Sequence, residues 1–215
     1  IPLPQLAVRS NVVRTGPAPD ICAGNAASHD LAFRRRQDGG YTVALGGYNE
    51  HFLCRESFRY LSRYLPLFRK SIGETRLRLG NAFGLNSGAR YWQPHEVSPF
   101  EETRVLNPPA GRAAVDLMRN RLARRLPALA DIPFVESWAG MIDTMPDVVP
   151  VMDRVTGQDG LFLATGFSGH GFGIGPAAGR IMADMIRGRP VCHDLSRFRF
   201  QRFSDGSAID LGPAL

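Results

Sequence analysis

Hydrophobic and polar residues first follow a strand-like pattern. Residues 6–15, LAVRSNVVRT, mix valine and leucine with polar positions and end at Gly16-Pro17, which predicts a strand closed by a turn. Two further runs of this kind lie in HDLAFRRRQDGGYTVALGG, on either side of Asp38-Gly39-Gly40. Aspartate followed by glycine favours a tight turn, so this segment is predicted to be a β-hairpin.

The pattern then changes to helical spacing in residues 57–71. Apolar residues three or four positions apart predict one apolar helix face, and they are Phe58, Leu61, Tyr64, Leu65 and Phe68. Pro66 lacks a backbone N–H, so a kink or break is expected there. A short strand at residues 75–79 and a loop rich in glycine, asparagine and serine follow.

A second helix is predicted for residues 111–126. Its apolar stripe consists of Val115, Met118, Leu122 and Leu126. Its other face carries many arginines, and we interpret them as a solvated face over a core stripe. Nucleic-acid binding would need a recognisable reading module or aromatic residues among the charges, and neither occurs here, so we predict no nucleic-acid partner.

Beyond residue 133 the chain predicts an extended segment, a short buried strand and a last helix. The extended segment contains Pro146 and Pro150, and the strand is the apolar run at residues 161–165. The helix is predicted over residues 176–187, because Pro176 suits a first helical turn and Gly188 lies just past its end.

Composition narrows the class of protein. The chain has 215 residues, 44% of them apolar, a formal charge of +6 and three cysteines with no paired spacing. It can bury a core in one or two domains, and no run is long and apolar enough to span a membrane. The cysteines suggest neither a disulfide framework nor a metal site, so we expect no metal and a cytoplasmic location. The chain does not begin with methionine, so we expect it to be processed or part of something longer.

The segment ATGFSGHGFGIGPAAGRIMADMI, residues 164–186, concentrates glycine between a strand and a helix. Residues 173–178 match the dinucleotide-binding motif G-x-G-x-x-A literally. The first glycine of that motif follows its strand directly, whereas about eight residues separate Thr165 from Gly173 here, and the chain that remains is too short for further βαβ units. We therefore predict no self-contained Rossmann site.

Two interpretations of the glycines remain. They could simply serve tight turns, or they could let the backbone approach a flat ligand closely. The helix start beyond them favours an electron-rich atom in front of Gly175 and Pro176. A reduced flavin, whose negative charge develops on its pyrimidine side, is such a ligand.

Three motifs together indicate a family. GLFLATGFSGHGFGIGPAAG, the preceding WAGMIDTMPDVVPVMD and the trailing HDLSRF resemble the C-terminal end of the D-amino-acid oxidase superfamily of FAD-dependent amine and amino-acid oxidoreductases, in its sarcosine oxidase and glycine oxidase branch. The motifs cover residues 134–198. The resemblance implies an α+β fold: a substrate-binding domain with an antiparallel or mixed sheet at residues 1–133, and the C-terminal strand-loop-helix portion of an FAD-binding α/β domain at residues 134–215. The family's N-terminal Rossmann half has no counterpart in the chain, so that half was truncated or lies on a partner subunit.

The resemblance also implies a set of residues around FAD. Those on the pyrimidine side are Gly166, Phe167, Ser168, Gly169, His170, Gly171, Phe172, Gly173 and Ile174. Near another edge of the ring are Gly140, Met141 and Ile142. Sarcosine oxidases attach flavin through a cysteine where this chain has Gly140, so FAD is expected to be non-covalent. The resemblance places Ala44 near the position where sarcosine oxidases carry the lysine that they use for oxygen activation. Both an oxidase and a dehydrogenase therefore stay open.

Candidate catalytic residues are His170 and Tyr48. His170 could act as an acid–base group or as a positioning hydrogen-bonding group, because the substrate nitrogen can also lose its proton to solvent. Tyr48 and His51 follow the hairpin where the family's substrate pocket lies, and Tyr91 and Trp92 could form an aromatic wall or simply pack.

The predicted reaction is oxidation of the C–N bond of a small-molecule amine or amino acid, of the sarcosine, glycine or D-amino-acid type, to an imine, with hydride transfer to flavin. The chain alone is expected to be inactive. The alternative is a non-catalytic substrate-binding or interaction subunit that keeps the fold without FAD.

Overall fold

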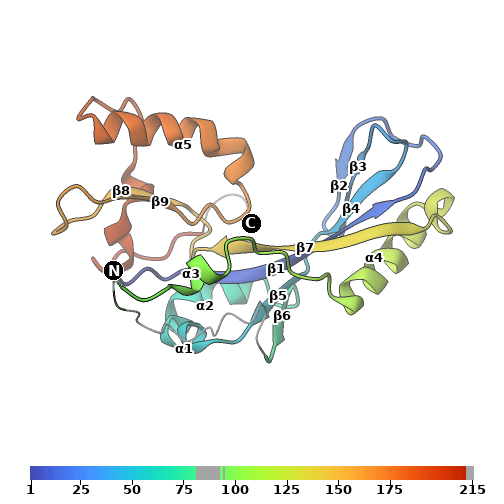
Figure 1. Ribbon diagram of the computed structural model, residues 1–215, viewed down its shortest axis with the longest axis horizontal. Helices are drawn as coiled ribbons and strands as arrows, with labels where there is room; N and C mark the ends of the chain where they lie inside the picture. The colour runs from blue at the N-terminus through green and yellow to red at the C-terminus, as the bar shows by residue number, and fades with distance from the viewer. Residues whose placement is uncertain (81–92, 94, 212–215) are drawn as a thin grey trace. The chain divides into compact units, whose positions relative to one another are not determined.

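The computed structural model describes residues 1–80, 93 and 95–211, and its chain divides into two compact units (Figure 1). Unit 1 comprises Ile1–Ala7, Arg55–Lys70 and Ile142–Leu215, and unit 2 comprises Val8–Cys54 and Ser71–Met141. Strands β1 (Leu6–Thr15) and β7 (Phe134–Thr144) contribute residues to both units. The assignment of residues 1–133 to substrate and 134–215 to FAD stays a prediction.

Unit 2 is built on a sheet of mixed strand orientation. Its strand order is β2-β3-β4-β1-β5-β6, with β7 also paired to β1. The further strands are β2 (Asn25–Ala27), β3 (Leu31–Arg35), β4 (Tyr41–Leu45), β5 (Asn49–Phe52) and β6 (Thr75–Arg78). Strands β5 and β6 run parallel, whereas β2 to β4 and their neighbour β1 pair antiparallel. The predicted hairpin is therefore confirmed as β3 and β4, and the expected mixed sheet is present.

One face of this sheet packs against helix α4 (Arg112–Arg125). Because side chains alternate along a strand, Leu31 and Val43 turn to the same side and meet Met118 and Leu122 of the helix. All four are at most 3% exposed. Burying a side chain of this size contributes about 1.5–3 kcal/mol, so the apolar stripe predicted for this helix is a principal part of the core. Helix α3 (Pro99–Glu102) and the 3-10 turn η1 (Pro127–Leu129) complete the helical elements described in unit 2.

The arginine face of α4 is solvated as predicted, with Arg124 and Arg125 68% and 45% exposed, but three of its arginines also bind the turn before β3. Arg121 donates to the backbone carbonyls of Asp30 and Gly46 at 2.7 and 2.9 Å. Arg124 and Arg125 reach the Asp30 carboxylate at 3.1 and 3.3 Å. The sequence pattern missed this because Asp30 lies in the turn before β3, far from the helix along the chain.

Unit 1 contains a two-stranded antiparallel sheet and several helical elements. Its elements are α1 (Arg55–Arg59), α2 (Leu61–Lys70), β8 (Val151–Arg154), β9 (Phe162–Thr165), α5 (Gly171–Ile186), η2 (Ser196–Phe198) and η3 (Phe200–Phe203). Met152 of β8 packs against Ala178 and Met182 of α5. The 3-10 turn η3 adds Phe203, which packs against Met145.

Two helix predictions are corrected. The break in the first helix falls at Tyr60, between α1 and α2, while Pro66 lies inside α2. Helix α5 begins at Gly171, five residues before Pro176. Both prolines stand in the second turn, so each removes a single backbone hydrogen bond near a helix start and does not end the helix.

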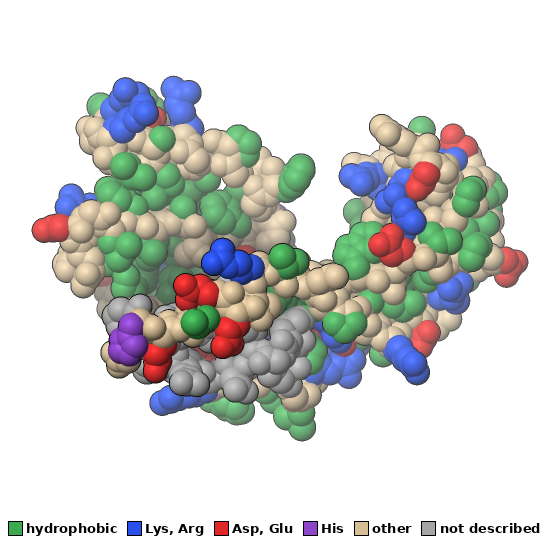
Figure 2. All heavy atoms as spheres, viewed as in Figure 1, with side chains coloured by type: hydrophobic (Ala, Val, Ile, Leu, Met, Phe, Trp, Pro, Cys, Tyr) green, Lys and Arg blue, Asp and Glu red, His purple; other side chains and the backbone are tan. Residues whose placement is uncertain are grey.

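In the described part of the chain, none of the helices has the length and apolar character that crossing a membrane requires. On the face of the molecule visible in Figure 2, acidic side chains are interspersed with the basic ones.

Candidate functional site

The loop of residues 166–170 joins β9 to α5 in a backbone conformation that L-residues rarely adopt. Its φ angles are positive at Gly166 (77°), Ser168 (50°) and Gly169 (88°). A Cβ added at Gly166 would overlap the Met145 side chain. Glycine is therefore required at 166 both by φ and by space.

The Asp143 carboxylate holds the first residue of the loop, Gly166. Asp143 accepts hydrogen bonds from the Gly166 N–H and from the Gln5 side-chain amide, each at 2.8 Å. Gln5 also donates to the Thr165 hydroxyl at 3.1 Å. Neither Asp143 nor Gln5 was identified from the sequence. Asp143 lies inside the motif WAGMIDTMPD, but a lone polar residue in a strand gives no signal of its partners.

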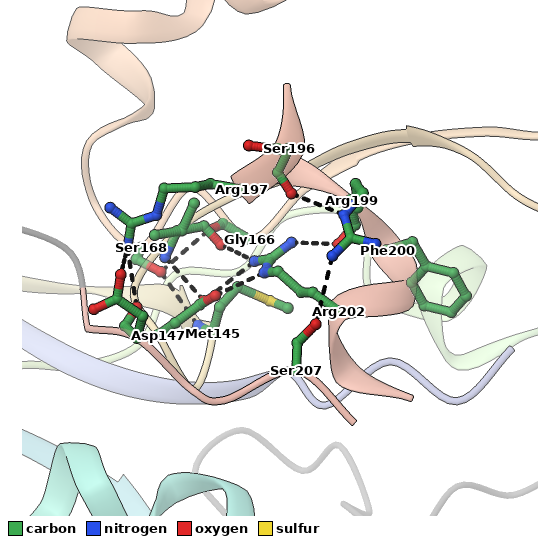
Figure 3. Close-up of polar contacts among 12 residues, drawn as sticks. Met145, Asp147, Gly166, Ser168, Ser196, Arg197, Arg199, Phe200, Arg202 and Ser207 are labelled. Atoms are coloured by element: carbon green, nitrogen blue, oxygen red, sulfur yellow. Dashed lines mark hydrogen bonds and ion pairs between the residues drawn. The ribbon is translucent and has the colours of Figure 1, made fainter. Parts of the chain in front are cut away.

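Ser168 fixes the middle of the loop with its side chain. Its hydroxyl accepts from the Met145 N–H at 3.2 Å and donates to the Gly166 carbonyl at 3.1 Å (Figure 3). The resemblance implied a place for Ser168 on the pyrimidine side of FAD and no role for its hydroxyl. The structure shows that its hydroxyl stabilises the positive φ conformation of its own loop, a use of serine that is common in turns.

The start of α5 presents backbone N–H groups without partners in its own helix. His170 is the N-cap residue, and no side chain caps the helix. The first helical hydrogen bond described runs from Gly173 N–H to the His170 carbonyl at 3.1 Å. The N–H groups of Gly171 and Phe172 precede it, at the positive end of the helix dipole.

The glycines after His170 lie inside a helix that we predicted to begin only at residue 176. Gly171, Gly173 and Gly175 lie in α5, and none of them has a positive φ. The prediction of a helix start at Gly175-Pro176 was therefore wrong. A Cβ added at Gly173 or Gly175 would have no neighbour within 4 Å in the described part of the chain, whereas at Gly171 it would approach the Phe167 Cβ to 3.3 Å.

This loop and helix start fit one side of a flat, electron-rich ring. Gly169 and His170 are exposed, and the Phe172 side chain is fully so. The two leading N–H groups suit partial negative charge, and bare glycine backbone permits close approach. The residues present are consistent with contact to a flavin.

The other predicted flavin residues divide between the two units. Ile142 belongs to unit 1, and its Cγ2 lies 3.6 Å from the position of a Cβ added at Gly169. The structure thus brings Ile142 beside the loop. Gly140 and Met141 belong to unit 2, where Gly140 is exposed and a Cβ there would have no described neighbour within 4 Å.

Tyr48 lies in a buried polar cluster of unit 2. Its side chain is 6% exposed, and its hydroxyl accepts from Arg78 at 3.3 Å. Arg78 also forms an ion pair with Glu50 at 2.9 Å. His51 is buried as well, while Tyr91 and Trp92 lie outside the described residues.

Glu50 is the centre of this cluster. Burial acts to raise its pKa, but hydrogen bonds from Asn11, Arg9 and Arg78 outweigh burial and hold the pKa below its ordinary value. Arg9 pairs with it at 2.8 Å and Asn11 donates at 3.1 Å. The cluster joins β1, β5 and β6, so no single stretch of sequence could have revealed it.

Comparison with known proteins gives one family and several relatives. The model of the FAD dependent oxidoreductase family matches residues 1–185. A glycine oxidase of Pseudomonas aeruginosa is 40% identical over 76 residues, which are 35% of this chain and 21% of that protein. An N-methyl-L-tryptophan oxidase of Salmonella typhi is 33% identical over 119 residues, which are 55% of this chain and 29% of that protein.

Solved structures show the same fold. An L-amino acid deaminase from Proteus vulgaris superposes with a TM-score of 0.82 and 25% identity over 94% of this chain and 47% of its own. A glycine oxidase from Geobacillus kaustophilus gives a TM-score of 0.61 at 14% identity, over 94% of this chain and 40% of its own. The chain spans less than half the length of each of these four proteins.

Proposed function

The chain belongs to the FAD-dependent oxidoreductase family, and from this membership we propose that it forms part of an enzyme that oxidises the C–N bond of an amine or amino acid to an imine, with hydride transfer to FAD. The relatives are named as oxidases of glycine and of N-methyl-L-tryptophan, both of which carry such a bond. The observation that carries the proposal is the loop of residues 166–170 with the uncapped start of α5.

Residues of that loop and of the α5 start would hold the flavin. The N–H groups of Gly171 and Phe172 would donate to its electron-rich pyrimidine side, and Asp143 keeps the loop in position through Gly166. FAD supplies the hydride acceptor when bound. We propose contacts with residues 166–174 and with Gly140, Met141 and Ile142, and no covalent bond, since Gly140 carries no nucleophile.

His170 is proposed to position substrate or to move its proton. Its backbone is fixed by the hydrogen bond from its N–H to the Phe167 carbonyl at 2.8 Å, while its imidazole is exposed and caps no helix N–H. The imidazole is thus available to a ligand at the helix start. Tyr48, by contrast, accepts a hydrogen bond from Arg78, so we propose that it positions Arg78 in the buried cluster around Glu50.

The test compares two preparations: the chain alone, and the chain produced together with a Rossmann half, supplied on the same polypeptide or as a second chain. FAD affinity is measured by fluorescence titration, and reduction is followed anaerobically at the flavin absorbance band with sarcosine, glycine, D-alanine and N-methyl-L-tryptophan. We expect the chain alone to be colourless, with FAD affinity no tighter than high micromolar, because phosphate and adenosine contacts would come from the Rossmann half.

The longer preparation should be yellow and should be reduced by at least one of these amines. A longer preparation that binds no FAD, or binds it and is reduced by none of the amines, would overturn the proposal and favour the non-catalytic subunit. A yellow, stoichiometric flavoprotein obtained from the chain alone would show that the Rossmann half is not needed.

A further inference from the structure

Helices α1 and α2, labelled in Figure 1, carry an apolar stripe that the fold leaves exposed. The sequence predicted a single apolar face for this segment, but of the five residues in that face only Tyr64 is buried. Phe58, Leu61 and Leu65 are 69%, 51% and 41% exposed. Their spacings of three and four residues place them along one side of the helical segment. Exposed apolar residues gathered in this way mark an interaction site, whereas single ones need no explanation.

Helical hydrogen bonding continues across the break between α1 and α2. The Tyr60 N–H donates to the Glu56 carbonyl at 2.9 Å, and the Tyr64 N–H donates to the Tyr60 carbonyl at 3.2 Å. Both bonds have the spacing of an α-helix, so the two helices keep one phase. Phe58 of α1 therefore continues the row formed by Leu61 and Leu65 of α2. Both helices belong to unit 1, so the stripe lies within a single unit.

Tyr64 fixes which side of α2 meets solvent. Its side chain is 3% exposed. Its hydroxyl accepts from the Leu6 N–H at 3.1 Å and donates to the Pro4 carbonyl at 3.0 Å. Successive residues of a helix project about 100° apart, so Leu65 points away from this buried anchor. The stripe is thus held outward by the packing of unit 1 itself.

Cations surround the stripe. Residues 55–70 carry a net charge of +4, from the single acid Glu56 and five basic residues: Arg55, Arg59, Arg63, Arg69 and Lys70. Arg55 precedes Phe58 by three residues and Arg69 follows Leu65 by four, so the stripe begins and ends with an exposed cation on the same side. Among the ion pairs of the described residues, none includes any of the five cations.

We infer that the α1–α2 surface, which comprises this stripe and its five cations, docks on an anionic lipid bilayer. Phe58, Leu61 and Leu65 enter the boundary between headgroups and acyl chains, and the cations bind lipid phosphates. A lipid surface conforms to the convex side of a helix, whereas a folded protein partner needs a matching groove. A second copy of this chain would bring a like charge of +4 against the surface and be repelled.

Co-sedimentation with vesicles tests the inference. The 215-residue chain, and the chain with a Rossmann half, are mixed with vesicles of phosphatidylcholine and phosphatidylglycerol in equal parts, or of phosphatidylcholine alone. We expect both preparations to bind the anionic vesicles about tenfold or more tightly than the neutral ones. Added salt should release them, because it screens the cations. Equal binding to the two kinds of vesicle, or binding to neither, would overturn the inference.

The preparation with a Rossmann half shows whether that half covers the stripe. Vesicle binding by the chain alone that disappears when the half is present would identify the α1–α2 surface as an interface inside the enzyme, and would overturn the inference. Poly-L-glutamate is a second probe, for a partner of the other class. Retention of poly-L-glutamate without vesicle binding would indicate an acidic polypeptide and would also overturn it.

A substitution in the stripe tests its apolar contact. Phe58→Ser should weaken binding to the anionic vesicles about tenfold or more, because a phenylalanine no longer enters the bilayer. Ile186→Ser is the matched control, since Ile186 is 60% exposed at the end of α5 in the same unit. Both positions are exposed, so neither change disturbs the core. Equal affinities of the two variants would contradict insertion of the stripe.

A pair of substitutions tests the cations. Arg55→Gln with Arg69→Gln should weaken binding by roughly fivefold for each charge removed. Arg180→Gln with Arg187→Gln removes the same charge from exposed positions of unit 1 outside the stripe and should leave binding unchanged. Equal losses in the two double variants would show that net charge alone attracts the vesicles, and would overturn the assignment to α1 and α2.

Discussion

Asp147 and Arg202 form a buried ion pair in unit 1, with Arg202 Nε donating to Asp147 Oδ2 at 2.6 Å (Figure 3). Their side chains are 7% and 8% exposed. Arg202 also donates to the Val149 carbonyl at 2.6 Å, and Val148 between them has a positive φ of 59°. The pair therefore fixes a strained turn that leads directly into β8.

Replacing Arg202 by methionine should lower the free energy of unfolding of unit 1 by about 3–5 kcal/mol, because it leaves the Asp147 carboxylate buried and unpaired. Urea denaturation followed by circular dichroism measures the change. Arg154→Met, which breaks the exposed pair with Asp159, is the control and should cost less than about 1 kcal/mol. Equal losses in the two variants would show that burial does not govern the contribution.

Gly166→Ala should destabilise unit 1, because it places a Cβ against Met145 at a φ of 77°. Strain of this kind costs about 1–3 kcal/mol. Gly173→Ala should be neutral or stabilising by up to about 1 kcal/mol, since alanine favours helix and its Cβ would have no described neighbour within 4 Å. Thermal denaturation of both variants measures these stability changes. A Gly166→Ala variant as stable as wild type would contradict the argument from backbone conformation.

Flavin affinity should respond to the glycines of the α5 start and not to the histidine side chain. In the preparation that includes a Rossmann half, Gly171→Ala or Gly173→Ala should weaken FAD roughly five- to two-hundred-fold, the equivalent of about 1–3 kcal/mol of steric cost. His170→Ala should retain FAD and slow anaerobic flavin reduction. If both glycine variants kept wild-type FAD affinity while His170→Ala lost it, the loop would act through its imidazole.

Acid should weaken the attachment of the β3 turn to α4. A hydrogen bond from Ser28, opposed by desolvation and assisted by Arg125, lowers the pKa of Asp30 from 3.8 to about 2. Because the folded pKa is depressed, this stabilisation is present above about pH 4 and is lost as the pH falls toward 2. The urea midpoint of wild type should therefore fall more steeply over this range than that of Asp30→Asn, and parallel profiles would exclude Asp30 as the cause.

Acid precipitation of the flavin-containing preparation should release all flavin to the supernatant. Gly140 has no side chain able to bond to the ring, and the cysteines Cys22, Cys54 and Cys192 lie outside the proposed flavin contacts. Absorbance spectra of supernatant and pellet provide the measurement. Flavin retained in the pellet would identify a covalent bond at some other residue.

The strands were predictable where local pattern alone decides them. Residues 6–15 form β1 with the bounds that the sequence indicated, and the Asp38-Gly39-Gly40 turn joins β3 to β4. The start of α5 was missed because glycine and proline are weak helix formers, so propensity favoured a loop up to Pro176. Packing of Ala178 and Met182 on β8 stabilises the helix instead.

The candidate site was predictable only in part for a related reason. A glycine cluster identifies a backbone-rich loop, but which glycines need a positive φ depends on neighbours such as Met145 and Asp143. Neighbours across strands could not be identified from the sequence either, because residues such as Ala27, Ala32 and Ala44 become adjacent only through strand register. Pairings of this kind are set by tertiary structure and not by local sequence.

The division into units has a consequence for synthesis on the ribosome. Every residue of unit 2 has been made once Met141 is added, whereas unit 1 needs Gln5 to meet Asp143 and Thr165, which are added later. Domains tend to fold in the order in which they emerge. Unit 2 can therefore acquire its sheet during translation, while the Gly166 loop is completed only after Asp143 and Thr165 have been added and can meet Gln5.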